Sequence, residues 1–399
     1  IVNFIIRAVD DILKDTFDIR DGLADHKRVT VLDFACGTGT FLLEVFEKAF
    51  ENIGGPDSGK AEPLVREHFL KNIYGFEYLI APYTIAHLKL SQYLRDKGHP
   101  LQEEERLQVF LTNTLEPVEP DKPTLLLPAI AAEAEAAHAV KKKPILVITG
   151  NPPYSGHSKN NGASIKDAIG GYKFTIETDA EGREYKKPLG ERNSKWLNDD
   201  YVKFIRFAQM KMDAVDEGIV AVITNHSWLD NPTFRGMRQS LMRTFQQIHT
   251  IDLHGNYKKK EVSPDGSKDE NVFDIEQGVA IAIFVKKPGL DHAQRHTDLW
   301  GRRIAKYQTS ANTSLNRLDW TSLNPSAPHY FLVSKSEAGS TEYGAGWSVS
   351  NIFQVKSVGF VTSRDRLAIA FTEQEMRDRI TDFVARDVED ARQHYSLGE

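Results

Sequence analysis

Short apolar runs alternate with stretches of helical apolar spacing up to residue 288. The first run ends at Leu32 and leads through a glycine-rich turn into a helical pattern at residues 41–49. Later runs predict strands, and the amphipathic stretches between them predict helices. The strands are expected within residues 71–79, 106–116, 143–150, 218–224, 247–255 and 278–287, and the helices within residues 1–13, 80–94, 128–140, 201–212 and 234–245.

Strands that alternate with helices indicate parallel βαβ units in an open α/β sheet. The continuous apolar run at residues 143–150 is typical of a buried parallel strand. Residues 155–199 are polar and rich in glycine, asparagine and lysine, so they predict one long loop. The alternation breaks at Pro288, which predicts a boundary between a domain at residues 1–288 and a mixed region at 289–399. A charged helix is expected within residues 372–395.

Composition narrows the class of protein only a little. The 399 residues are 40% hydrophobic and 27% charged, with a formal net charge of −6. This charge argues weakly against a uniformly basic nucleic-acid binder, although a local basic face is compatible with it. The single cysteine, Cys36, excludes an internal disulfide, and the thirteen histidines show no metal-ligand spacing. No stretch of the sequence is apolar for long enough to span a bilayer. We therefore expect a cytoplasmic protein without a metal or a membrane partner. Because the sequence begins with Ile1, we expect it to be part of a longer chain.

The glycine-rich turn "DFACGTGTF", residues 33–41, follows the first predicted strand. Gly37 and Gly39 allow a ligand to approach the backbone closely, and ligands of open α/β sheets bind at the carboxyl ends of the strands. Leu42 stands where a dinucleotide fingerprint would have its third glycine, which disfavours pyrophosphate binding. A plain tight turn is the structural alternative.

Two polar residues end the next predicted strands. Glu77 ends the second strand, where an acidic residue accepts hydrogen bonds from ribose hydroxyls in this architecture. Asn113 ends the third strand, and its amide is able to exchange hydrogen bonds with an adenine edge. A solvated strand end and a turn cap are the respective alternatives.

The motif "GNPPY", residues 150–154, follows the fourth predicted strand. The two prolines restrict the residues before them to extended conformations and remove two N–H donors. The Asn151 side-chain oxygen and the backbone carbonyls remain as acceptors, and Tyr154 adds an aromatic face. This arrangement suits a planar substrate that carries an NH₂ group. A rigid turn at the end of a strand is the alternative.

Phe273 is expected in a loop just before the last strand of the domain. An exposed aromatic side chain at this position would form a second wall around a flipped base. A core phenylalanine is the alternative.

The order of these motifs resembles the gamma subgroup of adenine-N6 DNA methyltransferases. "ITGNPPYSG", "YVKFIRFAQ", "ITNHSWLD" and "VFDIEQGVAIAIFVKK" are similar to the methylase region of Type ISP restriction–modification enzymes. The resemblance implies a Rossmann-like fold with a mostly parallel, seven-stranded sheet flanked by helices. It also implies S-adenosyl-L-methionine as cofactor, double-stranded DNA as partner, nuclease and helicase domains fused in the full-length protein, and the start of a target-recognition region after residue 288.

The resemblance assigns roles by position. The cofactor-binding residues would be Asp33, Ala35, Gly37, Gly39, Phe41, Glu77 and Asn113, although the family often has Asp at the last position. The catalytic residues would be Asn151, Pro152, Pro153 and Tyr154, and Phe273 would contact the target base. Basic residues of the region 155–260 would contact phosphate, namely Lys159, Lys195, Arg235 and Arg238.

The sequence thus favours site-specific methylation of adenine N6 in DNA. Asn-Pro-Pro-Tyr turns also serve methylation of ribosomal-RNA guanine and protein glutamine, and cytosine N4 is a further competitor. Asn151 leans towards adenine, because the cytosine enzymes more often carry Ser at that position. A non-catalytic module that binds DNA is the remaining alternative.

Overall fold

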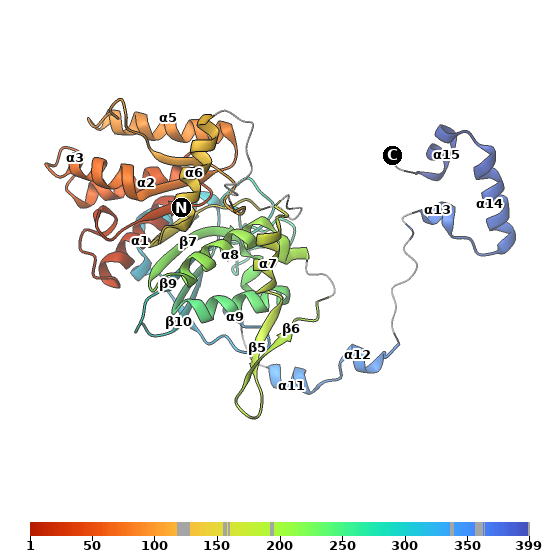
Figure 1. Cartoon of the computed structure of the whole chain (residues 1–399). Helices are drawn as coiled ribbons and strands as arrows, with labels where there is room; N and C mark the ends of the chain where they lie inside the picture. Colours follow the sequence, from red (N-terminus) through yellow and green to blue (C-terminus); the bar gives the residue numbers. More distant parts are fainter. Residues whose placement is uncertain are drawn as a thin grey trace. The chain divides into compact units, whose positions relative to one another are not determined.

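The computed structural model describes residues 1–117, 128–154, 158, 160–191, 195–335, 339–355, 362 and 364–397. The chain divides into two compact units, Ile1–Lys335 and Ser336–Glu399. The large unit holds the central sheet and every candidate site residue of the sequence analysis (Figure 1).

One sheet runs through the large unit in the order β11-β10-β8-β9-β7-β4-β1-β2-β3. The strands β7, β4, β1, β2 and β3 are mutually parallel, whereas β9 is antiparallel to both β7 and β8. The carboxyl ends of β1, β2, β3, β4 and β7 therefore meet at one edge. The strands are β1 (Val31–Asp33), β2 (Ile73–Glu77), β3 (Gln108–Leu111), β4 (Val147–Gly150), β7 (Gly218–Asn225), β8 (Gln247–Asp252), β9 (Val279–Lys286), β10 (Ala293–Asp298) and β11 (Thr321–Leu323).

Helices cover both faces of this sheet, because neighbouring residues of each strand face opposite sides. In β1, Val31 packs in one core cluster with α1, α2 and α5, whereas Leu32 packs in the other cluster with α6, α7, α8 and α9. The helices of the first cluster are α1 (Val2–Asp15), α2 (Thr40–Asn52) and α5 (Ile80–Asp96), with the short α3 (Ala61–Leu64) and α4 (Leu70–Asn72) between them. Those of the second cluster are α6 (Pro128–Lys142), α7 (Ala163–Gly170), α8 (Asp200–Asp213) and α9 (Arg235–Thr244).

The predicted fold class is confirmed: a large, mostly parallel sheet lies between two layers of helices (Figure 1). The predicted number of seven strands is wrong. Within the described residues the sheet has nine strands, because β10 and β11 extend the expected seven at one edge. The sequence hid them because β10, "AQRHTD", has few apolar residues and lies near the edge, half exposed.

The compact unit also continues past the boundary predicted at residue 288. The helix α10 (Arg303–Asn312) ties the later segment to the start of the chain, because Arg7 of α1 donates to the carbonyls of Ser310 and Thr313 at 2.7 and 3.0 Å. Lys306 of α10 is fully buried and lies 2.7 Å from the Asp269 carboxylate. The structural end of the sheet-bearing unit is therefore Lys335.

The long loop predicted for residues 155–199 is wrong for much of its described part. It contains α7 and a hairpin of β5 (Phe174–Thr178) and β6 (Glu184–Pro188). Gln239 of α9 holds the hairpin, since its side-chain amide accepts from the Ile176 N–H and donates to the Ile176 carbonyl at 2.6 and 2.7 Å. All of β6 is exposed and polar, which is why the sequence suggested a loop.

The small unit contains α11 (Ser340–Ala345), α12 (Val349–Ile352), α13 (Asp365–Ala368), α14 (Glu373–Ala385) and α15 (Val388–Tyr395). The single charged helix predicted for residues 372–395 is instead the pair α14 and α15. The Asp387 carboxylate caps α15 by accepting from the Glu389 and Asp390 N–H groups, which restarts the helix at a new axis. Arg386 bridges the two helices through Asp382 and Asp390.

A search of the described helices finds none that combines the length and the apolar character needed to cross a bilayer.

Candidate active site at the carboxyl edge of the sheet

The glycine-rich turn leaves β1 at Asp33 and enters α2 at Thr40. Gly37 and Gly39 have φ angles of +54° and +79°, a conformation that side chains with a Cβ rarely adopt. A Cβ at Gly37 would meet open space, whereas one at Gly39 would lie 3.3 Å from the Ala86 Cβ. The turn thus needs both glycines for its shape, and the space above Gly37 is available to a ligand.

Asp33 is fully buried at the start of this turn. Its Oδ1 accepts from the Ala35 N–H at 3.1 Å, while its Oδ2 has no hydrogen-bond partner. Burial raises the pKa of Asp33 to about 8, and the charge of Glu77 acts in the same direction. A buried polar atom without a partner is costly, so this carboxyl is suited to a ligand that hydrogen-bonds to it or that carries a positive charge and favours its ionised form.

Glu77 connects the first two strand ends. Its Oε2 accepts from the Gly37 N–H and its Oε1 from the Leu79 N–H, both at 2.8 Å. Each carboxylate oxygen has a second lone pair, so Glu77 is still able to accept hydrogen bonds from hydroxyl groups. The structure therefore brings Asp33, Gly37 and Glu77 together at one corner of the sheet edge.

Asn113 lies just after β3 and belongs to a polar network. Its Oδ1 accepts from the Leu115 N–H at 3.0 Å, and its Nδ2 donates to the Asn160 Oδ1 at 2.9 Å. The turn-cap alternative is therefore realised, and the same side chain also links β3 to the segment after the Asn-Pro-Pro-Tyr turn. Lys141 of α6 holds this position by donating to the Asn113 carbonyl at 2.6 Å.

The Asn-Pro-Pro-Tyr turn follows β4, next to β1 in the sheet. Asn151 and Pro153 are exposed, whereas Pro152 is buried. The Tyr154 hydroxyl donates to the Asn151 Oδ1 at 2.8 Å, which leaves one lone pair of that oxygen open. The Tyr154 ring meets Tyr201 of α8 edge to face, with centroids 6.3 Å apart.

The acid–base character of Tyr154 follows from its surroundings. Burial raises the pKa of the Tyr154 hydroxyl far above its ordinary value, and the charge of Asp199 acts in the same direction. The phenol is therefore neutral at physiological pH. It is able to orient Asn151 but does not act as a strong base.

The two predicted aromatic contacts lie in the core clusters. Phe41 is 4% exposed on α2, and Phe273 is partly buried and packs against the same cluster. The backbone of Phe273 is held on both sides, since its N–H donates to Asn271 and its carbonyl accepts from Arg303. Phe273 is thus partly a core residue, as the alternative interpretation expected. The cofactor contact of Phe41 and the base contact of Phe273 stay predictions.

The four basic residues predicted to contact phosphate lie in different surroundings. Arg238 is fully buried and donates to the carbonyls of Trp228, Asn231, His329 and Tyr330, so the prediction for it is wrong. Its side chain satisfies carbonyls that would otherwise lack a partner. Arg235 is paired with Glu191, Lys195 lies over the Trp196 ring, and Lys159 lies outside the described residues.

Two residues that the sequence analysis did not select organise the segment after the turn. Asp200 and Lys203 of α8 are both buried, and Lys203 donates to the Ser158 Oγ and the Asn160 carbonyl at 2.7 and 2.6 Å. Asp200 accepts from Asn160 at 2.9 Å. The signal was present, because a lysine within the apolar stretch "YVKFIRFAQ" has to find buried acceptors.

The strand order gives a large, mostly parallel α/β sheet flanked by helices, and this fold matches methyltransferase structures of restriction–modification enzymes. More specifically, residues 71–258 match the model of the Eco57I restriction-modification methylase family. A sequence comparison with curated proteins finds no match.

Solved structures of restriction–modification enzymes are similar to most of the chain. The chain is similar to the ATP-dependent Type ISP restriction-modification enzyme LlaBIII bound to DNA, with 24% identity and a TM-score of 0.71 over 98% of this chain and 26% of that one. A nuclease-deletion mutant of the Type ISP enzyme LlaGI, in complex with a DNA substrate mimic, gives 24% identity and a TM-score of 0.72 over 96% of this chain and 35% of that one. The structure of the DrdV–DNA complex gives 25% identity and a TM-score of 0.69 over 98% of this chain and 38% of that one. The chain thus spans well under half the length of each of these proteins, and the resemblance stated from the motifs is confirmed.

Proposed function

We propose that this chain transfers a methyl group from S-adenosyl-L-methionine to the N6 amino group of an adenine in double-stranded DNA. The observation that carries the proposal is the meeting of three strand ends at one sheet edge. The glycine-rich turn after β1 and Glu77 after β2 lie on one side of it, and the Asn-Pro-Pro-Tyr turn after the neighbouring β4 lies on the other.

The residues present suit this cofactor. The open space above Gly37 accepts a ligand close to the backbone, and Glu77 retains lone pairs for the ribose hydroxyls. Asp33 supplies a buried carboxyl whose Oδ2 lacks a partner, and a positively charged group nearby would favour the ionised form of this carboxyl. S-adenosyl-L-methionine supplies an electrophilic methyl group on a sulfonium.

The turn after β4 would hold the acceptor base. The adenine has to leave the base stack, because its amino group is paired inside the duplex. Asn151 Oδ1 accepts one amino hydrogen with its open lone pair, and a backbone carbonyl of the proline pair accepts the other. These bonds would keep electron density on the amino nitrogen. That nitrogen would bond to the methyl carbon while the sulfur–methyl bond breaks and its electron pair stays on sulfur, and it would then lose one proton to water. Holding both partners in place supplies much of the rate.

DNA as substrate is supported by the family match and by the DNA complexes of the similar enzymes. We extend the proposal to the full-length protein, in which nuclease and helicase domains would accompany the methylase, and to the cytoplasm as its location. Target choice would reside largely beyond the sheet-bearing unit.

Asn151→Ala and Tyr154→Ala in the full-length protein test the proposal. Both variants should bind S-adenosyl-L-methionine normally in calorimetry while methyl transfer to DNA is lost, and Asn316→Ala, at an exposed asparagine, should behave like the wild type. Mass spectrometry of the nucleosides identifies the acceptor. Methylated cytosine N4, guanine in RNA or protein glutamine would replace the substrate in the proposal, and absence of cofactor binding would favour a non-catalytic DNA-binding module.

A further inference from the structure

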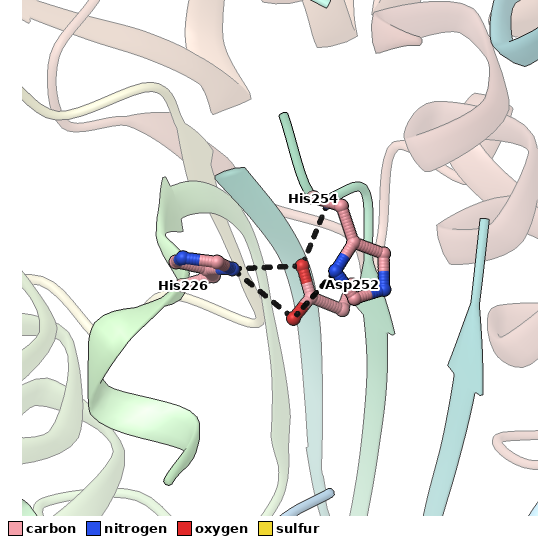
Figure 2. Close-up of side chains that lie close together, drawn as sticks. All are labelled: His226, Asp252 and His254. Atoms are coloured by element: carbon pink, nitrogen blue, oxygen red, sulfur yellow. Dashed lines mark hydrogen bonds and ion pairs between the residues drawn. The ribbon is translucent and has the colours of Figure 1, made fainter. Parts of the chain in front are cut away.

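A second group of polar side chains lies at the ends of β7 and β8. His226 follows β7 directly, Asp252 ends β8, and His254 comes two residues later. All three are more than nine-tenths buried, at 5%, 6% and 7% exposure. Figure 2 shows the Asp252 carboxylate between the two imidazole rings.

The backbone holds His254 in an uncommon conformation. Its φ angle is +52°, which non-glycine residues rarely adopt, and Gly255 follows at +80°. The His254 N–H donates to the Asp252 Oδ1 at 2.8 Å, and the Gly255 N–H donates to the Asp269 Oδ2 at 2.7 Å. Such conformations persist where the surroundings enforce them, often at functional sites.

The His254 ring is fixed on one side only. Its Nε2 lies 2.8 Å from the Asp298 Oδ1, and Trp300 stacks on the ring with the planes 13° apart. A proton on Nε2 donated to Asp298 leaves the Nδ1 lone pair free. That Nδ1 is buried and has no hydrogen-bond partner in the part of the chain that the structure describes.

Nδ1 of His254 faces the carboxylates of Asp252 and Glu261. Nδ1 of His254 lies 3.7 Å from the Asp252 Oδ2 and 4.0 Å from the Glu261 Oε2, which is too far for hydrogen bonds. A lone pair facing two carboxylates is unfavourable unless a cation lies between them. Ligand atoms that share one ion with bonds of about 2.0–2.2 Å lie roughly 3–4 Å apart. The Asp252 carboxylate lies 3.0 Å from Nδ1 of His226 and 3.7 Å from Nδ1 of His254, and both distances fall in that range.

We propose that His226, Asp252 and His254 bind a divalent transition-metal ion, for which Zn²⁺ is the appropriate probe. One ligand atom from each residue can be chosen so that all lie within 4.8 Å of one another, and imidazole with carboxylate is a donor set that zinc accepts. The partners of the outer nitrogens complete the site, because Asp298 contacts Nε2 of His254 and Asn256 contacts Nε2 of His226.

The ion would shift a proton within the His226 ring. Nδ1 of His226 lies 3.0 and 3.1 Å from the two Asp252 oxygens, and the proton shared there has to pass to Nε2 of the same ring when Nδ1 becomes a ligand. The Asn256 amide, which now contacts the other ring nitrogen at 3.2 Å, would turn over to accept from it. A cavity of about 280 Å³ borders the three side chains and gives an ion a route of entry.

The consequence lies in the loop between β8 and β9. His254 and the segment up to Gly278 carry Phe273, the predicted contact of the target base. An ion joining the end of β7 to this loop would fix the loop without taking part in methyl transfer. This group could not be found from the sequence alone, because the three residues are separated by 26 positions and then 2.

Metal analysis of the full-length protein, purified without a histidine tag, tests the site. After removal of metal with a chelator, we expect one Zn²⁺ per chain to bind in calorimetry. Zn²⁺ should raise the unfolding midpoint by several degrees. Co²⁺ should give the visible absorption bands of an imidazole and carboxylate site.

Variants separate this site from surface histidines. His254→Ala should lower the affinity for Zn²⁺ by at least about 100-fold, and Asp252→Asn, which preserves shape, should abolish the Co²⁺ bands even if the first variant is unstable. His292→Ala, at an exposed histidine, should leave both unchanged. If the wild type binds neither ion, or if Asp252→Asn binds Co²⁺ with the same spectrum, the proposal is wrong.

Discussion

Replacement of Asp33 by asparagine isolates the cost of burying an acid at the start of the cofactor turn. Asparagine has the same shape and keeps the oxygen that accepts from the Ala35 N–H at 3.1 Å. It removes the group whose pKa burial raises from its ordinary value of 3.8 to about 8. The variant therefore changes one titration and little of the packing.

The sign follows from where the proton is held. Between pH 4 and pH 8 the folded protein keeps the Asp33 proton, whereas the unfolded chain has lost it, so rising pH favours unfolding. The titration of Asp33 therefore costs no stability below pH 3.8, the ordinary pKa of the group. Stability is lost progressively as the pH rises from there to about 8, the pKa of Asp33 in the folded protein. The slope is about 1.4 kcal/mol per pH unit, so the wild type should lose roughly 3 kcal/mol relative to Asp33→Asn between pH 5 and pH 7.

Urea unfolding of both proteins at pH 5, 6 and 7 measures this difference, and the comparison cancels the titration of all other groups. Asp57→Asn, at an exposed aspartate, is the matched control and should track the wild type at each pH. A gap between Asp33→Asn and the wild type that stays constant from pH 5 to pH 7 would refute the assigned burial of a protonated carboxyl.

Two further substitutions test the same corner of the sheet edge. Gly39→Ala should destabilise the protein by about 1–3 kcal/mol, because φ is +79° and the new Cβ would lie 3.3 Å from Ala86. The control Gly59→Ala, whose new Cβ would contact nothing, should leave the stability unchanged, and equal urea midpoints for the two variants would show that Gly39 is not strained by a side chain. Glu77→Gln should weaken binding of S-adenosyl-L-methionine about 10- to 100-fold in calorimetry, since hydrogen bonds to a charged acceptor contribute roughly 1.5–3 kcal/mol. An unchanged affinity would remove Glu77 from the site.

The sequence was sufficient for the parallel part of the sheet, because its strands are continuous apolar runs. "KPILVITG" contains β4 and "GIVAVIT" lies within β7, and both are buried along their length in the structure. The strand-end residues could be selected for the same reason, since a polar residue after such a run has to lie at the sheet edge. The β5–β6 hairpin and β10 could not be predicted from the apolar pattern, because exposed strands do not need apolar residues.

Other features depend on contacts between distant segments. Arg238 looks like a surface cation on a basic helix, yet its four carbonyl partners place it in the core. The neighbours of His226 are supplied by strand pairing that joins β7 to β8 through the antiparallel β9. A single sequence does not contain these distances.

Adenine as the acceptor is tested most directly by single-molecule sequencing of DNA from cells that express the full-length gene. We predict N6-methyladenine in one sequence context with the wild type, and none with Asn151→Ala produced at the same level. Methylated cytosine, or an unchanged adenine signal in the Asn151→Ala strain, would contradict it.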